Sequence, residues 1–197
     1  MKRLAIILLL WGVNTASFGQ MTPPFPTVDG KINFSDIVAV EGAGKDELYE
    51  RAKIWFADAF VSSNSVIQLA NKERGLIMGK GVATERNEYW EKRWNFTIKI
   101  QIKDEKYKVE VYDIHYSFLP DLSKQAPNMR AMMSFSRIEE QSLDALYADR
   151  KRMYDKKGSG LKKGFSTILA NSTNAQFNAL LESLNKQISS GVVLDDF

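Results

Sequence analysis

The chain of 197 residues has no cysteine and only one histidine. Without cysteine it forms no disulfide bond, and it carries no lipid anchor of the bacterial type, which is attached to a cysteine thiol. Protein sites for zinc and copper are built mainly from cysteine and histidine, so the composition argues against such sites. The sequence therefore predicts no metal and no cofactor, and a fold that packing alone stabilises.

The motifs of the common enzyme classes are missing as well. No Gly-x-Ser-x-Gly stretch is present, and the pairs Gly44-Lys45 and Gly79-Lys80 lack the other residues of a phosphate-binding loop. Paired acidic residues leave no local signature, so a hydrolase that uses carboxylates stays open at this stage. We predict a protein that is not an enzyme.

The N-terminus has the pattern of a signal peptide. Lys2 and Arg3 precede an apolar run over residues 4–13, which is too short for a permanent membrane helix. Small residues two positions apart then end at Gly19, as at a signal-peptidase site. We therefore expect residues 1–19 to be removed and the mature protein to be periplasmic or secreted, without a lipoprotein anchor.

Charge and hydrophobicity indicate an ordinary globular protein. The whole chain has 27 basic and 24 acidic residues, and residues 1–19 hold two of the basic and none of the acidic ones. The mature chain therefore has a net charge of +1 rather than +3. With 44% hydrophobic residues we expect an extended lead-in over 20–30, one α+β domain over 31–191 and a frayed tail over 192–197.

The clearest pattern is a strict alternation of apolar and polar residues from Trp94 to Ile102, which predicts a strand with one buried face. A two-residue hairpin turn then pairs Ile98 with Val111 on the following strand. From Tyr112 onward the apolar residues change parity. The change predicts either a β-bulge or a sheet that is covered on both faces.

Other periodicities predict the remaining elements. Helices are expected over 46–62 and over 174–189, the second opened by a capping box at Thr173 and Gln176. The segment 119–172 is interpreted as a helical insertion before the last helix. Further expected elements are strands at 31–40, 65–70 and 75–83, an edge strand in the Met-rich stretch 129–133, a helix over 139–154 and a short helix at 165–169. Together these predict an antiparallel sheet of about five strands.

Several short runs between residues 45 and 81 stand out. They are Lys45-Asp46-Glu47-Leu48-Tyr49, Ala52-Lys53, Trp55-Phe56, Val66-Ile67-Gln68, and Gly75-Leu76-Ile77 with Gly79-Lys80-Gly81. They resemble a family of exported bacterial domains of unknown function with a TBP-like fold. The resemblance covers about residues 31–118 and the last helix, and implies the order strand, helix, four antiparallel strands, helix. It implies no chemistry, because "TBP-like" names a shape there and not DNA binding.

One binding hypothesis concerns aromatic rings near a guanidinium group. Trp90 lies close to Arg93 in the sequence, and Tyr112 and Tyr116 would lie near Arg93 on the second face of the sheet. Such a patch suits a peptide or a glycan, and burial under the 119–172 insertion explains these residues at least as well. We hypothesise a non-catalytic exported binding or interaction module whose partner is an envelope protein, a peptide or a glycan, and not nucleic acid.

Two rival hypotheses remain. Asp113 and His115 on one strand suggest an acid–base pair, so the alternative is a small cell-envelope hydrolase, although a structural role explains the pair more simply. A basic cluster offset only by Asp155 suggests contact with an anionic surface, and a solvated loop explains it more simply. The cluster consists of Arg150, Lys151, Arg152, Lys156, Lys157, Lys162 and Lys163.

Overall fold

The computed structural model describes residues 24–60, 63–156 and 160–190. The predicted signal peptide (1–19) and the predicted tail (192–197) lie outside these residues. Among the described residues, no helix is long and apolar enough to cross a membrane. The second half of the lead-in, predicted to be extended, forms a small hairpin together with the start of the strand predicted over 31–40. Its strands are β1 (Thr27–Val28) and β2 (Lys31–Ile32), so the predicted strand is divided at Asn33.

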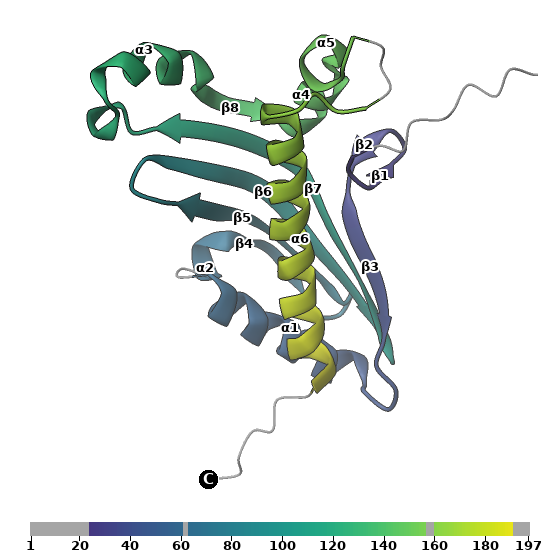
Figure 1. Ribbon diagram of the computed structural model, residues 1–197. Helices are drawn as coiled ribbons and strands as arrows, with labels where there is room; N and C mark the ends of the chain where they lie inside the picture. Colours follow the sequence, from purple (N-terminus) through teal and green to yellow (C-terminus); the bar gives the residue numbers. More distant parts are fainter. Residues whose placement is uncertain (1–23, 61–62, 157–159, 191–197) are drawn as a thin grey trace, which may run out of the picture.

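Six strands form one antiparallel sheet, which confirms the predicted α+β class. The order is β3-β7-β6-β5-β4, and β8 pairs with the far part of β7 (Figure 1). The sixth strand, β8, comes from a segment in which the sequence predicts a helix. The strands are β3 (Phe34–Ala39), β4 (Ile67–Asn71), β5 (Leu76–Arg86), β6 (Trp90–Lys103), β7 (Lys106–Pro120) and β8 (Ile138–Ser142).

Two helices, α1 (Lys45–Ala59) and α6 (Phe165–Ser190), lie on one face of this sheet (Figure 1). Every even-numbered residue of β6 from Trp94 to Ile102 is buried on that face, as the alternation predicts. The guanidinium group of Arg51 on α1 donates to the carbonyl oxygen of Ile188 on α6 at 2.7 Å and so ties the two helices together. The opposite face carries the odd-numbered residues of β6 and is called the open face below.

Polar side chains inside the core are paired across the layers. Asp36 lies on the buried side of β3, where it accepts a hydrogen bond from the Asn185 amide on α6 at 2.8 Å. The Tyr107 hydroxyl in turn donates to the Asn185 side-chain oxygen at 2.6 Å. Burial raises the pKa of Tyr107 to about 12, so this hydroxyl stays a donor. This network explains why one acidic residue interrupts the apolar parity of β3.

The last helix corrects one prediction. It runs without a break from Phe165 to Ser190, so the predicted short helix and the predicted helix over 174–189 are one element. Thr173 is fully buried inside it, and its hydroxyl oxygen accepts the indole N–H of Trp94 at 2.9 Å. The capping box at Thr173 and Gln176 is therefore wrong, because a residue on the sheet uses the hydroxyl that a cap would use.

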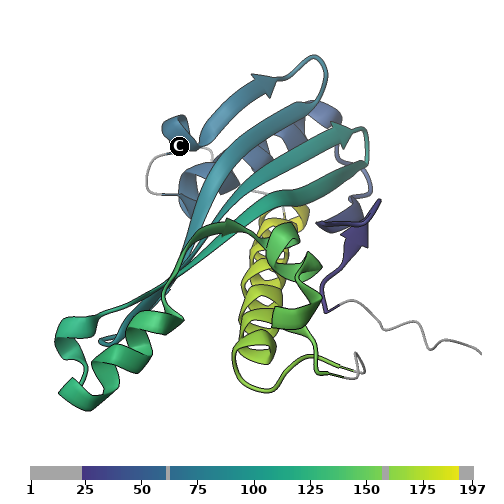
Figure 2. The same cartoon turned by 90° about the horizontal axis from the view of Figure 1, so that it is seen from above.

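The segment 119–172 also differs from its prediction as a purely helical insertion. The Met-rich stretch lies in a helix, α3 (Pro127–Ser136), and not in an edge strand, because Pro127 begins a helix and methionine favours one. The helix predicted over 139–154 is divided, since its first part pairs with β7 as β8. Figure 2 shows α3 beside the far end of the strands, away from α6. The other short elements are α2 (Ser63–Val66), η1 (Leu122–Lys124), α4 (Leu143–Ala148) and α5 (Arg150–Met153).

A β-bulge resets the parity of β7. The predicted register is confirmed up to the pair Ile98 and Val111. Thr97 then pairs with Tyr112 and Asn95 with His115, so β7 contains one residue more than β6 between these pairs. Asp113 lies in this interval with a φ of 53°, a conformation that residues other than glycine adopt infrequently. Of the two explanations of the parity change, the bulge is the correct one.

A pocket at the bulge

The bulge separates the two tyrosines that the sequence analysis grouped together. Tyr116 points into the core, is 2% exposed and lies beside Trp94, with ring centroids 5.6 Å apart. Tyr112 pairs with Thr97 and lies on the open face, half-buried. The hypothesis that both rings project to the second face is therefore wrong for Tyr116. Because the bulge adds one residue to β7, each residue after it lies on the opposite face from the one that strict alternation along the strand predicts.

Arg93 and Trp90 do not complete a patch with these tyrosines. Arg93 pairs with Ser117 on the open face, and its guanidinium group forms an ion pair with Glu91 at 2.5 Å. The Trp90 ring is half-buried, with the Lys92 ammonium group 4.5 Å from its centroid. The four predicted site residues, Trp90, Arg93, Tyr112 and Tyr116, are therefore distributed over the open face, the core and the end of β6.

The predicted acid–base pair is loose and largely exposed. The closest side-chain atoms of His115 and Asp113, Nδ1 and Oδ1, are 3.9 Å apart. The side chains are 35% and 58% exposed, and His115 Nδ1 lies closer, at 3.3 Å, to the Asp113 carbonyl oxygen. No specific contact here favours proton transfer over a surface interaction.

The bulge lies where the outer edge of β7 changes partners. On that edge β3 pairs with β7 as far as Phe34 and Val111, and β8 begins at the pair Ser142 and His115. Neither strand pairs with residues 112–114. Between the two strands, the β1–β2 hairpin and α4 contact β7. A hydrogen bond connects the hairpin with α4, since the Ile32 backbone N–H donates to the Asp144 carboxylate at 2.7 Å.

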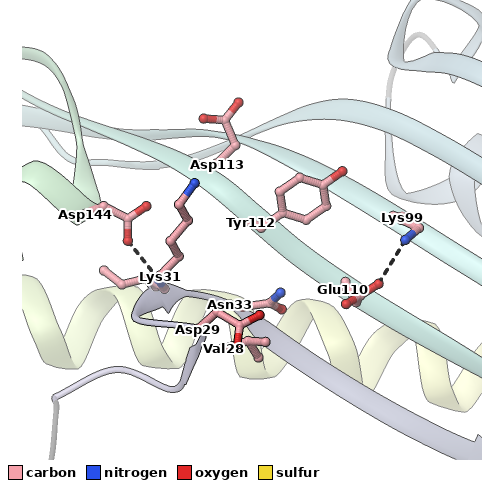
Figure 3. Close-up of a pocket in the computed structure, with 10 residues that line it drawn as sticks. Val28, Asp29, Lys31, Asn33, Lys99, Glu110, Tyr112, Asp113 and Asp144 are labelled. Atoms are coloured by element: carbon pink, nitrogen blue, oxygen red, sulfur yellow. Dashed lines mark hydrogen bonds and ion pairs between the residues drawn. The ribbon is translucent and has the colours of Figure 1, made fainter.

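A pocket of about 630 Å³ occupies this gap (Figure 3). Two unusual backbone positions bring acidic residues to its rim, Asp113 in the bulge and Asp29 in the hairpin turn. Asp29 and Gly30 have φ values of 51° and 76°, the pattern of a type I′ turn. The lining residues are Val28, Asp29, Lys31, Ile32, Asn33, Lys99, Glu110, Tyr112, Asp113 and Asp144.

Some of the charged groups in the pocket are already paired. Glu110 accepts from the Lys108 ammonium group at 2.7 Å and from that of Lys99 at 3.3 Å, and these hydrogen bonds, the one from Lys108 above all, lower the pKa of Glu110. The pKa of Tyr112 is raised by burial and, to a smaller extent, by the negative charges of Glu110 and Asp113. At neutral pH the pocket therefore holds the Glu110 carboxylate, which is paired with lysines, and beside it the neutral phenol of Tyr112.

Other polar groups in the pocket lack a protein partner. The Asn33 side-chain oxygen is buried, and no donor within the described residues reaches it. Lys31 extends from the hairpin toward the strand that carries Asp113 (Figure 3), and neither Lys31 nor Asp29 forms an ion pair with a described residue. The pocket thus offers a cation and two carboxylates, Asp29 and Asp113, to a molecule from solution, beside a buried acceptor that has no partner among the described residues.

The predicted basic cluster is only partly within the described residues. The Lys162 ammonium group donates to the Lys151 carbonyl oxygen, and the Arg152 guanidinium group lies 5.5 Å from the Phe165 ring centroid. Two members of the cluster thus have contacts within the fold. The side chain of Arg150 and residue Lys157 lie outside the described residues, and surface binding by this cluster stays a prediction.

The fold and its bulged strand can be compared with known proteins. Residues 34–117 match a family model. Its description is "Domain of unknown function (DUF4468) with TBP-like fold". The match confirms the resemblance that the short runs indicate, and it contains α1 and the strands from β3 to most of β7. The comparison with curated proteins gives no match.

Solved structures support the same fold over most of the chain. A TBP-like protein from Parabacteroides distasonis is 16% identical, with a TM-score of 0.61 over 86% of this chain and 99% of that one. A DUF4468 family protein from Bacteroides ovatus is 16% identical, with a TM-score of 0.57 over 82% of this chain and 90% of that one. At these identities the similarity shows the fold alone.

Sequence reasoning missed most of the pocket, although one signal was present. The dipeptide Asp29-Gly30, flanked by Val28 and Lys31, is a strong signal for a two-residue hairpin. It lies in the stretch predicted to be extended, because nearby prolines dominated that interpretation. Two predictions came closest to the site: Asp113 and Tyr112 as candidate site residues, and the change of apolar parity at residue 112. No local pattern connects those residues with Asn33 or Asp144.

Proposed function

We propose that the pocket at the bulge binds a short peptide in extended conformation, without catalysis. The observation that carries this proposal is the buried Asn33 oxygen without a protein donor. Leaving a buried acceptor unpaired costs roughly 1–3 kcal/mol. Asn33 lines the pocket, so a turn of its side chain would present this oxygen to a bound donor and remove that penalty. A peptide N–H group is such a donor.

The open edge of β7 favours a peptide over other ligands. Residues 112–114 lie between the ends of β3 and β8, and neither strand pairs with them. An extended peptide adds to such an edge through its main chain, with its side chains directed alternately into pockets. The gap has room for only about three residues at the rise of a β-strand. We therefore expect recognition of a short segment rather than of a long strand.

The charges in the pocket suit a peptide with free ends. Lys31 can pair with a carboxylate, while Asp29 and Asp113 can pair with an ammonium group. Tyr112 adds a ring that is half-buried and still has accessible surface. An uncharged glycan would leave these cationic and anionic groups without partners, so the geometry favours the peptide.

The test is an NMR titration of the purified protein with trialanine. We expect the amide signals of residues 112–114 and the side-chain amide of Asn33 to shift. In Asn33→Leu binding should be lost, while thermal stability should rise, because an unpaired acceptor is replaced by an apolar group of similar size. Asn171→Leu, at an exposed position on α6, is the matched control and should retain binding.

Four outcomes would contradict the proposal. The first is that trialanine leaves these signals unshifted at millimolar concentration, and the second is that Asn33→Leu binds as well as the parent protein. A trimer of N-acetylglucosamine that shifts the same signals, when trialanine does not, would replace the peptide by a glycan. A fall in the stability of Asn33→Leu would show that Asn33 is a structural residue.

We also propose that the mature protein is exported, on the basis of the signal-peptide pattern in residues 1–19. Intact-mass analysis of the protein from the periplasm or the medium tests this. A mature chain that begins at Gln20 is expected, and recovery of only the full-length chain from the cytoplasm would refute export.

A further inference from the structure

The open face of the sheet is strongly basic on strands β3 to β7, while β8, beside the far part of β7, carries Glu139 and Glu140. Residues that lie opposite each other in neighbouring strands share a face, so the register assigns side chains of β3 to β7 to the open face. One acidic side chain, Glu110, lies among six basic ones there, and the ion pair of Arg86 with Glu91 at one end adds no net charge. The six basic residues are Lys80, Arg93, Lys99, Lys103, Lys106 and Lys108.

This surplus of five positive charges contrasts with the rest of the molecule. Residues 20–197 have a net charge of +1, so the remainder of the mature chain has a net charge of −4. Counting the exposed Asp113 with the open face lowers the surplus to four. The charges are therefore segregated, and a near-neutral protein presents one cationic surface.

Three basic residues of this face are available to a ligand. Within the described residues, no carboxylate lies within ion-pair distance of Lys80, Lys103 or Lys106. Lys103 and Lys106 flank the β6–β7 turn and line a hollow of about 290 Å³ together with Lys108, Gln101 and Ile37. Ile37 is 69% exposed at this hollow, so the face is open to solvent there.

The side chains between the lysines indicate the kind of polyanion. Hydroxyl and amide groups alternate with the charges, as at Thr84, Asn95 and Gln101. Such groups form hydrogen bonds with sugar hydroxyls. Sheet surfaces that bind single-stranded nucleic acid stack bases on aromatic rings, and among the described strands Tyr112 is the one Phe, Tyr or Trp on this face.

We propose that the open face is a docking surface for an acidic polysaccharide, whose carboxylate or sulfate groups are held by the lysines around Lys103 and Lys106. The open face and the peptide pocket share Lys99 and Glu110, whereas Lys103 and Lys106 line a hollow that has no residue in common with the pocket. An anionic membrane fits this face less well. Its exposed apolar residues, Ile37, Leu69 and Val82, lie on three different strands and form no continuous patch for insertion.

The experiment compares the binding of polygalacturonate and dextran sulfate with that of uncharged dextran. The test variant is Lys103→Glu with Lys106→Glu. The matched control is Lys53→Glu with Lys186→Glu, at exposed positions on α1 and α6, which changes the net charge by the same amount. We expect both polyanions to bind the parent protein. The test variant should bind them at least about tenfold more weakly, because its reversed charges repel a polyanion. Its affinity should also depend less steeply on the salt concentration.

The control variant should bind within about twofold of the parent protein, because its changed residues lie on the helical side of the sheet. Equal losses in both variants would show that net charge alone governs binding and would overturn the proposal, as would binding of neither polyanion. Tighter binding of double-stranded DNA or of phosphatidylglycerol vesicles than of polygalacturonate would reject a polysaccharide as the occupant. Trialanine binding should be unchanged in the test variant, so this proposal and the peptide proposal fail separately.

Discussion

The hydrogen bond between Trp94 and Thr173 gives the sharpest test of the packing. Both side chains are fully buried, and the indole N–H reaches the Thr173 hydroxyl oxygen at 2.9 Å. Thr173→Val keeps the shape of the side chain and removes the acceptor. The indole N–H is then left buried without a partner, which costs about 1–3 kcal/mol. For a chain of this length each kcal/mol lowers Tm by about 2–4 °C.

The assay is urea and thermal unfolding followed by circular dichroism. Thr173→Ser keeps the acceptor and should lose only about 0.8 kcal/mol for the missing methyl group. In the background Trp94→Phe the indole N–H is absent, so Thr173→Val should then cost little, and the double-mutant cycle isolates the hydrogen bond. Thr173→Val with the stability of the parent protein, or equal costs in both backgrounds, would refute the reasoning.

A further variant separates a continuous α6 from a helix that begins at a capping box. If Thr173 were an N-cap, Gln176 would take part in the cap, and Gln176→Ala would destabilise the protein by roughly 1 kcal/mol. Inside a continuous helix the same change should be neutral or slightly stabilising, since alanine has the higher helix propensity. A loss as large as that of Thr173→Val would support the capping box and contradict the helix described here.

Two other changes follow from local geometry. In Gly81→Ala the added Cβ atom would lie 2.6 Å from Phe96 Cζ, so we expect the free energy of unfolding in urea to fall by about 1–3 kcal/mol. The control is Gly160→Ala, where the added Cβ atom has nothing within 4 Å and stability should hardly change. Similar stabilities of the two variants would mean that β5 is not packed closely at Gly81. The cationic partners of Glu110 lower its pKa in the folded state below the ordinary 4.5. The contribution of Glu110 to the stability of the fold is therefore complete above pH 4.5 and is lost as the pH falls through the pKa of the folded state. The Tm difference between the parent protein and Glu110→Gln should therefore be largest near neutral pH and shrink in acid, and a difference that grows in acid would contradict this assignment.

Several elements could be predicted because their signals are local and repeated. The alternation from Trp94 to Ile102 identifies the buried side of β6, since successive side chains of a strand point to opposite faces. The apolar stripe of α1 and the register up to Val111 follow from the same kind of reasoning. A resemblance in short runs then extended these predictions to the fold class, which the family match confirms.

Other elements could not be predicted from the chain one segment at a time. The propensities of 139–154 favour a helix, but the free edge of β7 offers residues 138–142 a ladder partner, and tertiary pairing overrides propensity there. Thr173 looks like a cap in the sequence because a hydroxyl near a glutamine is a capping pattern. In the fold Trp94, 79 residues away in the chain, uses that hydroxyl instead.

The sequence by itself determined the periodic faces of the strands and of α1, the absence of cysteine chemistry, and the place where β7 changes parity. Each of these depends on neighbours within a few residues. The pocket and the basic open face were decided only by the tertiary structure. The pocket needs Asp29 and Asn33 from the hairpin segment, Tyr112 from β7 and Asp144 from α4, which are three separate segments, and the basic face needs a register that aligns lysines of different strands. Contacts between distant segments form because the core packs as one unit, and no local pattern records them.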